Sequence, residues 1–163
     1  MPIKDIVQPE ILPVSSELRL RRYDGVHDFA FVWYQDPEIV RLVDGVAKPY
    51  DRDTLDRMYS YLDKHGELYF IEALADNGWK PIGDVTLCRE DVPIVIGDGD
   101  YRGRGVGRAV ITALIRRARS LGWGSLQVQE IYHFNTGSQK LFTGVGFTVT
   151  GETDKGKKYI LNL

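Results

Sequence analysis

The chain has 163 residues, of which 43% are hydrophobic and 27% charged, an ordinary balance for a globular protein. This length predicts one domain over residues 1–163 with a substantial core. No apolar run approaches the roughly 20 residues of a membrane-spanning helix, and the N-terminal segment lacks the apolar centre of a signal peptide. One cysteine, Cys88, excludes an internal disulfide. We therefore expect a cytoplasmic protein that does not act at a membrane.

The net charge of −2 conceals an uneven distribution along the chain. Residues 1–100 carry 11 basic and 20 acidic residues, a net charge of −9, whereas residues 101–163 carry 10 basic and three acidic residues, a net charge of +7. This asymmetry indicates different electrostatic tasks for the two parts. The alternative is a fold that interleaves them into an ordinary mixed surface.

The first half of the chain begins with a segment that we expect to be irregular, residues 1–16, which contains three prolines. Apolar and basic residues then alternate over 18–23, as in a half-buried strand. Residues 26–35 and 37–43 predict two short helices, the second of which starts at a proline.

A longer helix is predicted over 51–66, with an aspartate cap signal at its start and a glycine at its end. Strands over 67–74 and 80–88 flank a turn that contains an Asn-Gly step, which indicates a hairpin. The apolar run 92–96 is a further strand.

The last third of the chain continues with a helix over 106–122, which has a wide apolar face and a C-terminal glycine. A strand over 125–132, a short helix over 135–144 and two closing strands over 146–152 and 157–163 follow. Strand, helix and strand in succession imply one parallel pair, whereas the hairpins are antiparallel. The predicted class is therefore mixed α/β.

The segment between the strand at 92–96 and the long helix is rich in glycine and arginine. Glycines let the backbone approach a ligand closely, and the free N–H groups at a helix start attract phosphate. The residues concerned are Gly103, Gly105, Gly107, Arg102, Arg104 and Arg108. The lysine and Ser/Thr of a Walker A loop are missing. A dinucleotide fingerprint is the closest rival, because Glu130 lies at about the right distance, but Arg108 occupies its last small position.

Two motifs resemble those of the GNAT acetyltransferases. The first is "YRGRGVG", which matches the family's Arg/Gln-x-x-Gly-x-Gly/Ala signature through Arg102, Gly105 and Gly107. The second is "FNTGSQKLFTGVGF", which begins with Asn135 and ends in a Gly-Phe pair. The chain further resembles the branch with ribosomal-protein, polyamine and aminoglycoside acetyltransferases. The resemblance implies a mixed, mostly antiparallel sheet with one splayed parallel strand pair, flanked by helices.

The resemblance also implies acetyl-CoA as the cosubstrate and no metal. Backbone amides of the glycine turn are expected to hold the pyrophosphate, the strand edge to pair with the pantetheine arm, and Asn135 to bind that arm or to cap the following helix. Lys140 is expected either near the nucleotide phosphates or in solvent. The expected coenzyme-binding residues are Ile94, Val95, Ile96, Arg102, Gly103, Arg104, Gly105, Val106, Gly107, Arg108, Asn135, Lys140 and Phe142.

Acetyl transfer to an amine needs a neutral amine, so a base must remove a proton near neutral pH. The carboxylates of Asp98 and Glu130 rank first because their strand ends face the expected cleft, with Asp100 and Asp84 behind them. Each is also an ordinary surface or turn acid in the alternative interpretation.

The leaving thiolate presents a second question, since relatives carry a tyrosine where this chain has Phe142. Tyr132 is the substitute proton donor that we consider, with a half-buried aromatic as its alternative role. Transfer without a dedicated acid is also compatible with a thiol of moderate pKa.

The remaining reactive residues predict no other chemistry. The three histidines show no metal spacing, and one cysteine cannot complete a thiolate zinc site. The basic stripe Arg116, Arg117 and Arg119 is read as a solvated helix face rather than a nucleic-acid site, because the isoelectric point is near 5.9.

The sequence thus predicts an N-acetyltransferase that acts as a monomer or homodimer. An acidic acceptor wall would attract a cationic amine: a polyamine, an aminoglycoside or a peptide amine. The rivals are a non-catalytic acyl-CoA-binding or sensing module of the same fold and an oxidoreductase with a nicotinamide cofactor.

Overall fold

The computed structural model describes residue 3 and residues 5–163. The strands of this part are β1 (Ile11–Pro13), β2 (Leu18–Arg22), β3 (Glu67–Ala75), β4 (Gly78–Leu87), β5 (Ile94–Ile96), β6 (Ser125–Tyr132), β7 (Thr148–Glu152) and β8 (Gly156–Asn162). The α-helices are α1 (Pro37–Asp44), α2 (Arg52–His65), α3 (Val106–Ser120) and α4 (Thr136–Gly144). Short 3₁₀ turns are η1 (Asp28–Ala30), η2 (Trp33–Gln35) and η3 (Gly99–Tyr101).

The strands of the described residues form two antiparallel sheets. Strands β1 to β5 pair in chain order, and the second sheet has the order β6-β8-β7. The predicted mixed α/β class with mainly antiparallel strands is confirmed. In the described part of the chain no ladder joins β5 to β6, so the strands on either side of α3 are splayed into different sheets.

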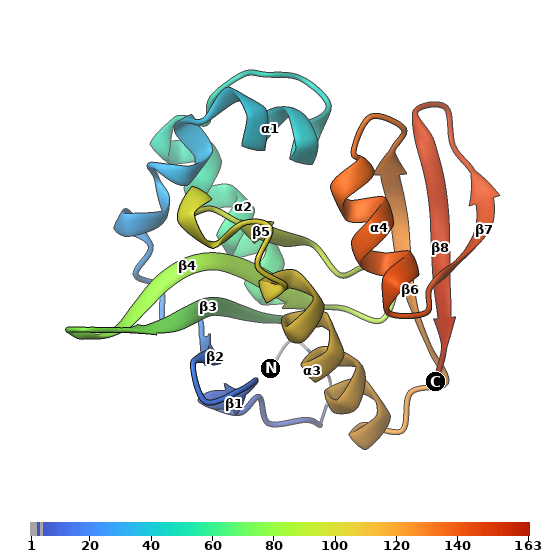
Figure 1. The fold of residues 1–163 in the computed structure, drawn as a ribbon, viewed down its shortest axis with the longest axis horizontal. Coiled ribbons are helices and arrows are strands. Elements are labelled where there is room, and N and C mark those ends of the chain that lie inside the picture. Colours follow the sequence, from blue (N-terminus) through green and yellow to red (C-terminus); the bar gives the residue numbers. More distant parts are fainter. Residues whose placement is uncertain (1–2, 4) are drawn as a thin grey trace.

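Helices cover both faces of the five-stranded sheet (Figure 1). Strand β3 is buried on both sides: Tyr69 and Ile71 belong to the core against α3, whereas Leu68 and Phe70 belong to an aromatic-rich core beneath α1 and α2. Helix α4 lies beside the second sheet (Figure 1). The glycine turn follows β5 at the edge of this sheet and leads into α3.

Local signals explain where the helices start. Asp36 caps α1 by accepting a hydrogen bond from the Glu38 N–H at 2.9 Å, and Pro37 takes the first helical position. Asp51 caps α2 through the Thr54 N–H at 2.7 Å. The sequence predicts the aspartate cap of α2 and the proline start of α1, because each depends only on neighbouring residues.

Three details differ from the sequence-based expectation. The segment 1–16, expected to be irregular, contains the edge strand β1, although residues 1, 2 and 4 lie outside the described part. Residues 26–35 form two 3₁₀ turns instead of a helix. The hairpin turn falls on Asp76 and Asn77, one residue earlier than the Asn-Gly step, and Gly78 already begins β4 with φ 107°.

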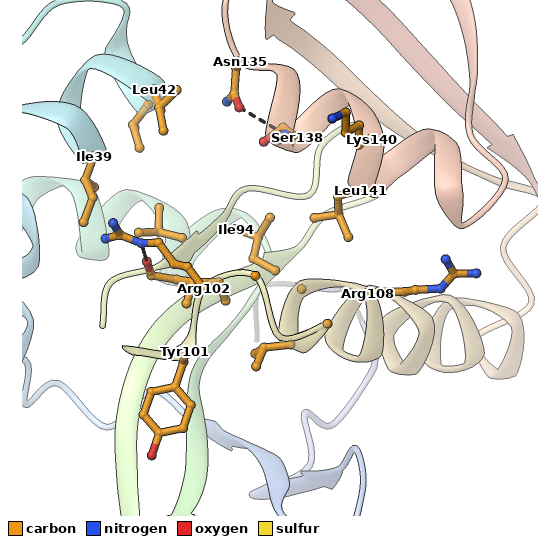
Figure 2. Close-up of a pocket in the computed structure, with 18 of the residues that line it drawn as sticks. Ile39, Leu42, Ile94, Tyr101, Arg102, Arg108, Asn135, Ser138, Lys140 and Leu141 are labelled. Atoms are coloured by element: carbon orange, nitrogen blue, oxygen red, sulfur yellow. Dashed lines mark hydrogen bonds between the residues drawn. The ribbon is translucent and has the colours of Figure 1, made fainter. Parts of the chain in front are cut away.

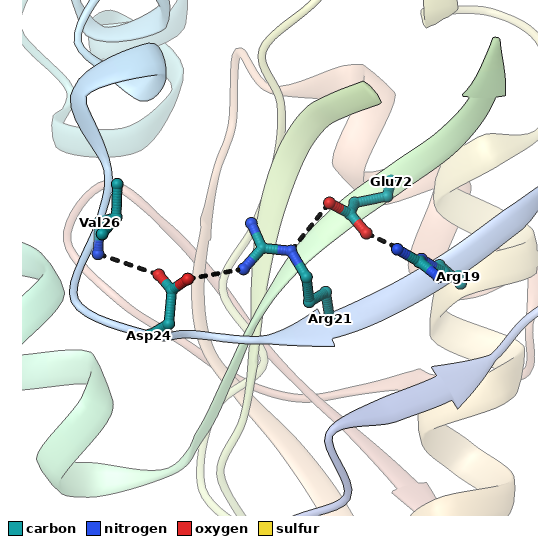
Figure 3. A network of polar contacts seen from close by, with 5 residues as sticks. All are labelled: Arg19, Arg21, Asp24, Val26 and Glu72. Carbon is teal, nitrogen blue, oxygen red and sulfur yellow. Dashed lines mark hydrogen bonds and ion pairs between the residues drawn. The ribbon is translucent and has the colours of Figure 1, made fainter. Parts of the chain in front are cut away.

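An ion-pair network joins β2 to β3 (Figure 3). Glu72 accepts one hydrogen bond from Arg19 and one from Arg21, each at 2.8 Å, through its two carboxylate oxygens. Asp24 binds the second arginine at 3.2 Å and also accepts the Val26 N–H at 3.0 Å. The network reinforces the register of two strands that are far apart in the sequence.

Within the described residues, no helix is both long and apolar enough to cross a membrane.

Candidate active site

The glycine turn before α3 presents a row of free backbone donors. Gly103 and Gly105 adopt positive φ angles of 71° and 78°, which L-residues avoid. The first helical hydrogen bond runs from the Ala109 N–H to the Gly105 carbonyl at 3.1 Å. From Gly103 to Arg108, no backbone N–H donates to any residue that the structure describes.

An anion fits this turn for reasons of both space and charge. A Cβ built on Gly103 or Gly105 would meet no atom within 4 Å, so the backbone faces open space. Among the described residues no side chain caps α3, and its N-terminus carries the positive end of the helix dipole. Consecutive free N–H groups at a helix start are suited to the oxygens of a diphosphate.

Strand β5 leads into the turn and has one free edge. Its other edge pairs with β4: the Gly97 N–H donates to the Ile82 carbonyl at 2.8 Å, and the Pro93 carbonyl accepts the Thr86 N–H at 3.0 Å. Polar groups alternate along an antiparallel strand, so those of Ile94 and Ile96 point away from β4. An extended amide-containing chain could pair there as an added strand.

A pocket of about 460 Å³ brings the turn, the strand and two helices together (Figure 2). Helix α1 contributes Glu38, Ile39, Leu42 and Val43, and α4 with its N-cap contributes Asn135, Gly137, Ser138, Lys140 and Leu141. The remaining lining residues are Ile94, Val95, Ile96, Tyr101, Arg102, Gly103, Gly105, Val106, Gly107 and Arg108. We call this cavity the glycine-turn pocket.

Most residues proposed from the sequence for coenzyme binding line this pocket, but Arg104 and Phe142 are not among its lining residues. The Arg104 guanidinium lies 5.9 Å from the Tyr101 ring centroid. Phe142 is buried and packs edge-on against Phe147, with ring centroids 5.2 Å apart. The phenylalanine at this position therefore belongs to the core.

Asn135 occupies the N-cap of α4, and its side-chain oxygen accepts the Ser138 N–H at 3.1 Å. The same side chain lies at the pocket wall (Figure 2). Capping engages the amide oxygen and leaves the NH₂ group as a donor toward the pocket.

Arg102 binds the end of β5 instead of projecting freely. Its Nε donates to the Ile96 carbonyl at 3.0 Å, and Nη2 donates to the Gly97 carbonyl at 3.3 Å. The same nitrogen lies 4.0 Å from the Asp36 carboxylate at the start of α1. Arg102 thus connects the glycine turn, the strand end and α1.

The two acids proposed as bases are both engaged elsewhere and do not line the pocket. Asp98 caps η3 and pairs with Lys80 at 2.9 Å, and the hydrogen bond from Lys80 lowers the pKa of its carboxyl. Glu130 is exposed on β6 and accepts a hydrogen bond from the Thr153 hydroxyl. Asp98 is consequently a weaker base than a free aspartate.

Tyr132 lies at the end of β6, beside the C-terminus of α1. Its ring stacks on Phe134 with centroids 5.3 Å apart, and a Cβ on Gly45 would come within 3.3 Å of it. Partial burial is the main cause that raises the pKa of its phenol, and the negative charges of Glu130 and Asp44 raise it further. The phenol therefore stays protonated at neutral pH.

A buried carboxylate behind β5 was ranked low by sequence reasoning. Asp84 is 2% exposed and accepts hydrogen bonds from the Tyr34 and Tyr59 hydroxyls at 2.7 and 2.8 Å. Burial raises the pKa of Asp84 to about 6, although both phenols act in the opposite direction. The chain offers no local signal for this trio, because its members are 25 and 50 residues apart.

Helix α1 supplies pocket residues that sequence reasoning missed. Ile39 and Leu42 point toward the cavity opposite β5 and α4 (Figure 2). The sequence indicated a helix here but not which cavity it covers.

The remaining reactive groups lie outside this pocket. Burial raises the pKa of the Cys88 thiol to about 12. No three His, Cys, Asp or Glu side chains of the described residues are grouped to hold a metal ion.

Comparison with known proteins identifies a family. Residues 17–148 match the family model described as an acetyltransferase (GNAT) domain. No curated protein matches the chain. The match covers most of the chain and includes both the glycine turn and α4.

Several solved structures share the fold at low sequence identity. An acetyltransferase from Salmonella typhimurium that modifies the N-terminal serine of ribosomal protein L7/L12 is 17% identical, with 94% of this chain and 99% of that chain covered and a TM-score of 0.72. Spermidine N-acetyltransferase from Vibrio cholerae is 21% identical, with coverages of 91% and 96% and a TM-score of 0.71. An aminoglycoside acetyltransferase bound to coenzyme A is 17% identical, with coverages of 89% and 94% and a TM-score of 0.70.

Proposed function

Since the chain belongs to the GNAT acetyltransferase family and is thus an acetyl-CoA-dependent N-acetyltransferase, we propose that it transfers the acetyl group directly to a primary amine of a cationic acceptor. The single observation that best supports this proposal is the row of free N–H groups from Gly103 to Arg108 in the glycine-turn pocket. These donors suit the diphosphate of the coenzyme.

The chain's own groups bind and orient both reactants. Bound acetyl-CoA supplies a thioester whose carbonyl carbon accepts the amine. The outward N–H and carbonyl of Ile94 and the N–H of Ile96 would pair with the pantetheine amides, because the Ile96 carbonyl is held by Arg102. The Asn135 NH₂ group would bind the same arm. Holding the two reactants in one pocket removes much of the entropic barrier, because a bimolecular step becomes effectively intramolecular.

We assign proton transfer to two residues of β6, neither of which lines the glycine-turn pocket. Tyr132 donates to the leaving group from the end of β6, beside the C-terminus of α1. Its raised pKa keeps the phenol protonated but makes it a weaker proton donor than an ordinary tyrosine. Glu130 accepts the amine proton through water, because the Lys80 contact makes Asp98 the weaker base. Phe142, at the position of the relatives' tyrosine, is fully packed and has no proton to give.

The charge distribution favours a cationic acceptor. Exposed acids on α1 and α2 include Glu38, Asp44, Asp53 and Asp56, and α1 forms one wall of the pocket. Glu38, Asp53 and Asp56 also contact basic side chains of their neighbours, so the negative excess is a property of the whole surface rather than of four free carboxylates. Such a surface raises the local concentration of a polyamine, an aminoglycoside or a peptide amine. The names of the three similar structures point to these same classes.

Release of free thiol from acetyl-CoA across an amine panel tests the proposal. The panel contains spermidine, kanamycin, a peptide with a free N-terminus, and glutamate. We expect release well above the enzyme-free rate with at least one cationic amine, and the slowest release with glutamate. Tight acetyl-CoA binding without turnover on any amine would instead indicate a binding module. A preference for glutamate would refute the cationic acceptor.

A further inference from the structure

A second pocket lies on the outer side of α3, and it is basic. Its volume is about 490 Å³, and it is bounded by α3 and by the segment from the end of α4 toward β7. Three of its lining residues are Arg108, Arg116 and Arg119, and none of the described residues that line it is acidic. We call this cavity the arginine pocket.

The three guanidinium groups are available to a ligand. None of them forms an ion pair with a described residue, and all three side chains are exposed. Their spacing of eight and three residues places them on one face of α3. Arg117, which is adjacent in sequence, faces another direction and binds the buried Glu67 at 2.7 Å. The basic stripe of the sequence is therefore divided between a structural ion pair and this pocket.

Arg108 links the arginine pocket to the glycine-turn pocket, because it lines both. Its side chain runs along α3, away from the glycine turn (Figure 2). One guanidinium nitrogen lies 3.6 Å from the place that a Cβ would take on Gly144, at the end of α4. The charge of Arg108 is thus directed toward the arginine pocket and away from the diphosphate site.

The floor of the arginine pocket is apolar. Ile115 is buried, and Val145 and Leu161 are half-buried, so their side chains offer an apolar surface between the arginines. Guanidinium groups bind phosphate oxygens with paired, charge-assisted hydrogen bonds, and an apolar floor accepts a planar ring. A concave pocket of this size fits one small ligand rather than the extended backbone of a nucleic acid.

The geometry points to a binding site, in the arginine pocket, for a phosphate monoester of a nucleoside, with the phosphate on the arginines and the aromatic base on the apolar lining. Two sources can supply this chemistry. One is the 3′-phosphate end of coenzyme A bound in the adjoining pocket, an assignment that rests on the proposed function. The other is a separate phosphorylated metabolite, which does not depend on acetyl transfer.

The test is isothermal titration calorimetry with an Arg116→Gln/Arg119→Gln double variant, which keeps Arg108 and with it the neighbouring pocket. The matched control is Arg52→Gln/Arg57→Gln on α2, which removes the same two charges outside the pocket. The titrants are coenzyme A and 3′-dephospho-coenzyme A. Adenosine 3′-monophosphate is titrated in addition into protein saturated with 3′-dephospho-coenzyme A.

Two results support the site and identify its source. If the coenzyme supplies the phosphate, the double variant binds coenzyme A about tenfold more weakly or worse, while its affinity for 3′-dephospho-coenzyme A matches that of the control. If a separate ligand supplies it, the double variant loses adenosine 3′-monophosphate binding and keeps both coenzyme affinities. Equal affinities of the double variant and the control for all three titrants would overturn the site. Because 3′-dephospho-coenzyme A lacks the 3′-phosphate, its affinity depends on the glycine-turn pocket alone. If the control also fails to bind this titrant, the proposed coenzyme site is wrong, independently of the arginine pocket.

Discussion

At the scale of single residues, Gly105 is the position where conformation and ligand access coincide. It combines φ of 78° with open space in front of its Cα, in the wall of the glycine-turn pocket. Gly105→Val would strain the backbone and project two methyl groups into that space. We expect the Kd for acetyl-CoA to rise by at least about tenfold in calorimetric titrations.

Gly25→Val is the matched control for this variant. Gly25 has a similar φ of 89° and also faces open space, but it does not line the pocket. Both variants should therefore lose a similar amount of thermal stability, whereas only Gly105→Val should lose affinity. Equal affinity for acetyl-CoA in the two variants would remove the turn from the coenzyme site.

Asp84 makes a prediction about the pH dependence of stability. Its pKa of about 6 in the folded protein exceeds the ordinary value of 3.8, so the folded chain holds this proton more tightly than the unfolded chain. The free energy of unfolding should therefore fall as the pH rises from about 4 to 6, by about 3 kcal/mol from this group. Asp84→Asn keeps an oxygen for Tyr34 and Tyr59 but cannot ionise. Urea denaturation across this pH range should show a flatter dependence for the variant.

The exposed Asp76→Asn is the control, because it removes a carboxylate from a turn without changing the core. It should keep the pH slope of the wild-type protein. If the free energy of unfolding of Asp84→Asn depended on pH as steeply as that of the wild-type protein, Asp84 would not be the group whose pKa the fold raises.

At the scale of elements, one ion pair supplements the apolar packing at the junction between α3 and β3. Arg117 on α3 donates to both oxygens of Glu67 at 3.0 and 2.7 Å, and Glu67 is 1% exposed. Tyr69 donates to the same carboxylate at 2.9 Å. Arg117→Ala would leave a buried charge with only this phenol, so we expect a loss of about 3–5 kcal/mol in chemical denaturation.

The neighbouring Arg116→Ala provides the comparison on the same helix. Arg116 is exposed and has no ion pair with a described residue, so its removal should change stability by less than about 0.5 kcal/mol. Similar losses in both variants would show that α3 is held by its apolar face alone.

At the scale of the whole molecule, the charge asymmetry predicts how the reaction responds to salt. Residues 1–100 carry the negative excess and residues 101–163 the positive one. With acetyl-CoA saturating, kcat/KM for spermidine should fall several-fold between 20 and 200 mM NaCl, because screening weakens the attraction of a polycation. The monocation ethanolamine should respond less. An identical response of both amines would show that the acidic surface has no part in capturing the acceptor.

The order of elements could be predicted from the sequence because its signals are local. These signals are the proline start of α1, the cap at Asp51, the hairpin turn and the glycine turn, and each depends on residues within a few positions of one another. The family follows from two such local motifs. Strand β1 could not be predicted, because a strand of three residues at a sheet edge is too short to show an alternation of apolar and polar residues.

What the sequence determined by itself was therefore the class of fold, the family and the position of the glycine turn. Only the tertiary structure decided what surrounds that turn. Contacts across 50 residues enclose Asp84 and Glu67. Packing turns α1 toward the glycine-turn pocket and places the Arg108 guanidinium beside the end of α4. Burial and orientation arise from the joint packing of distant segments, and no window of neighbouring residues contains that information.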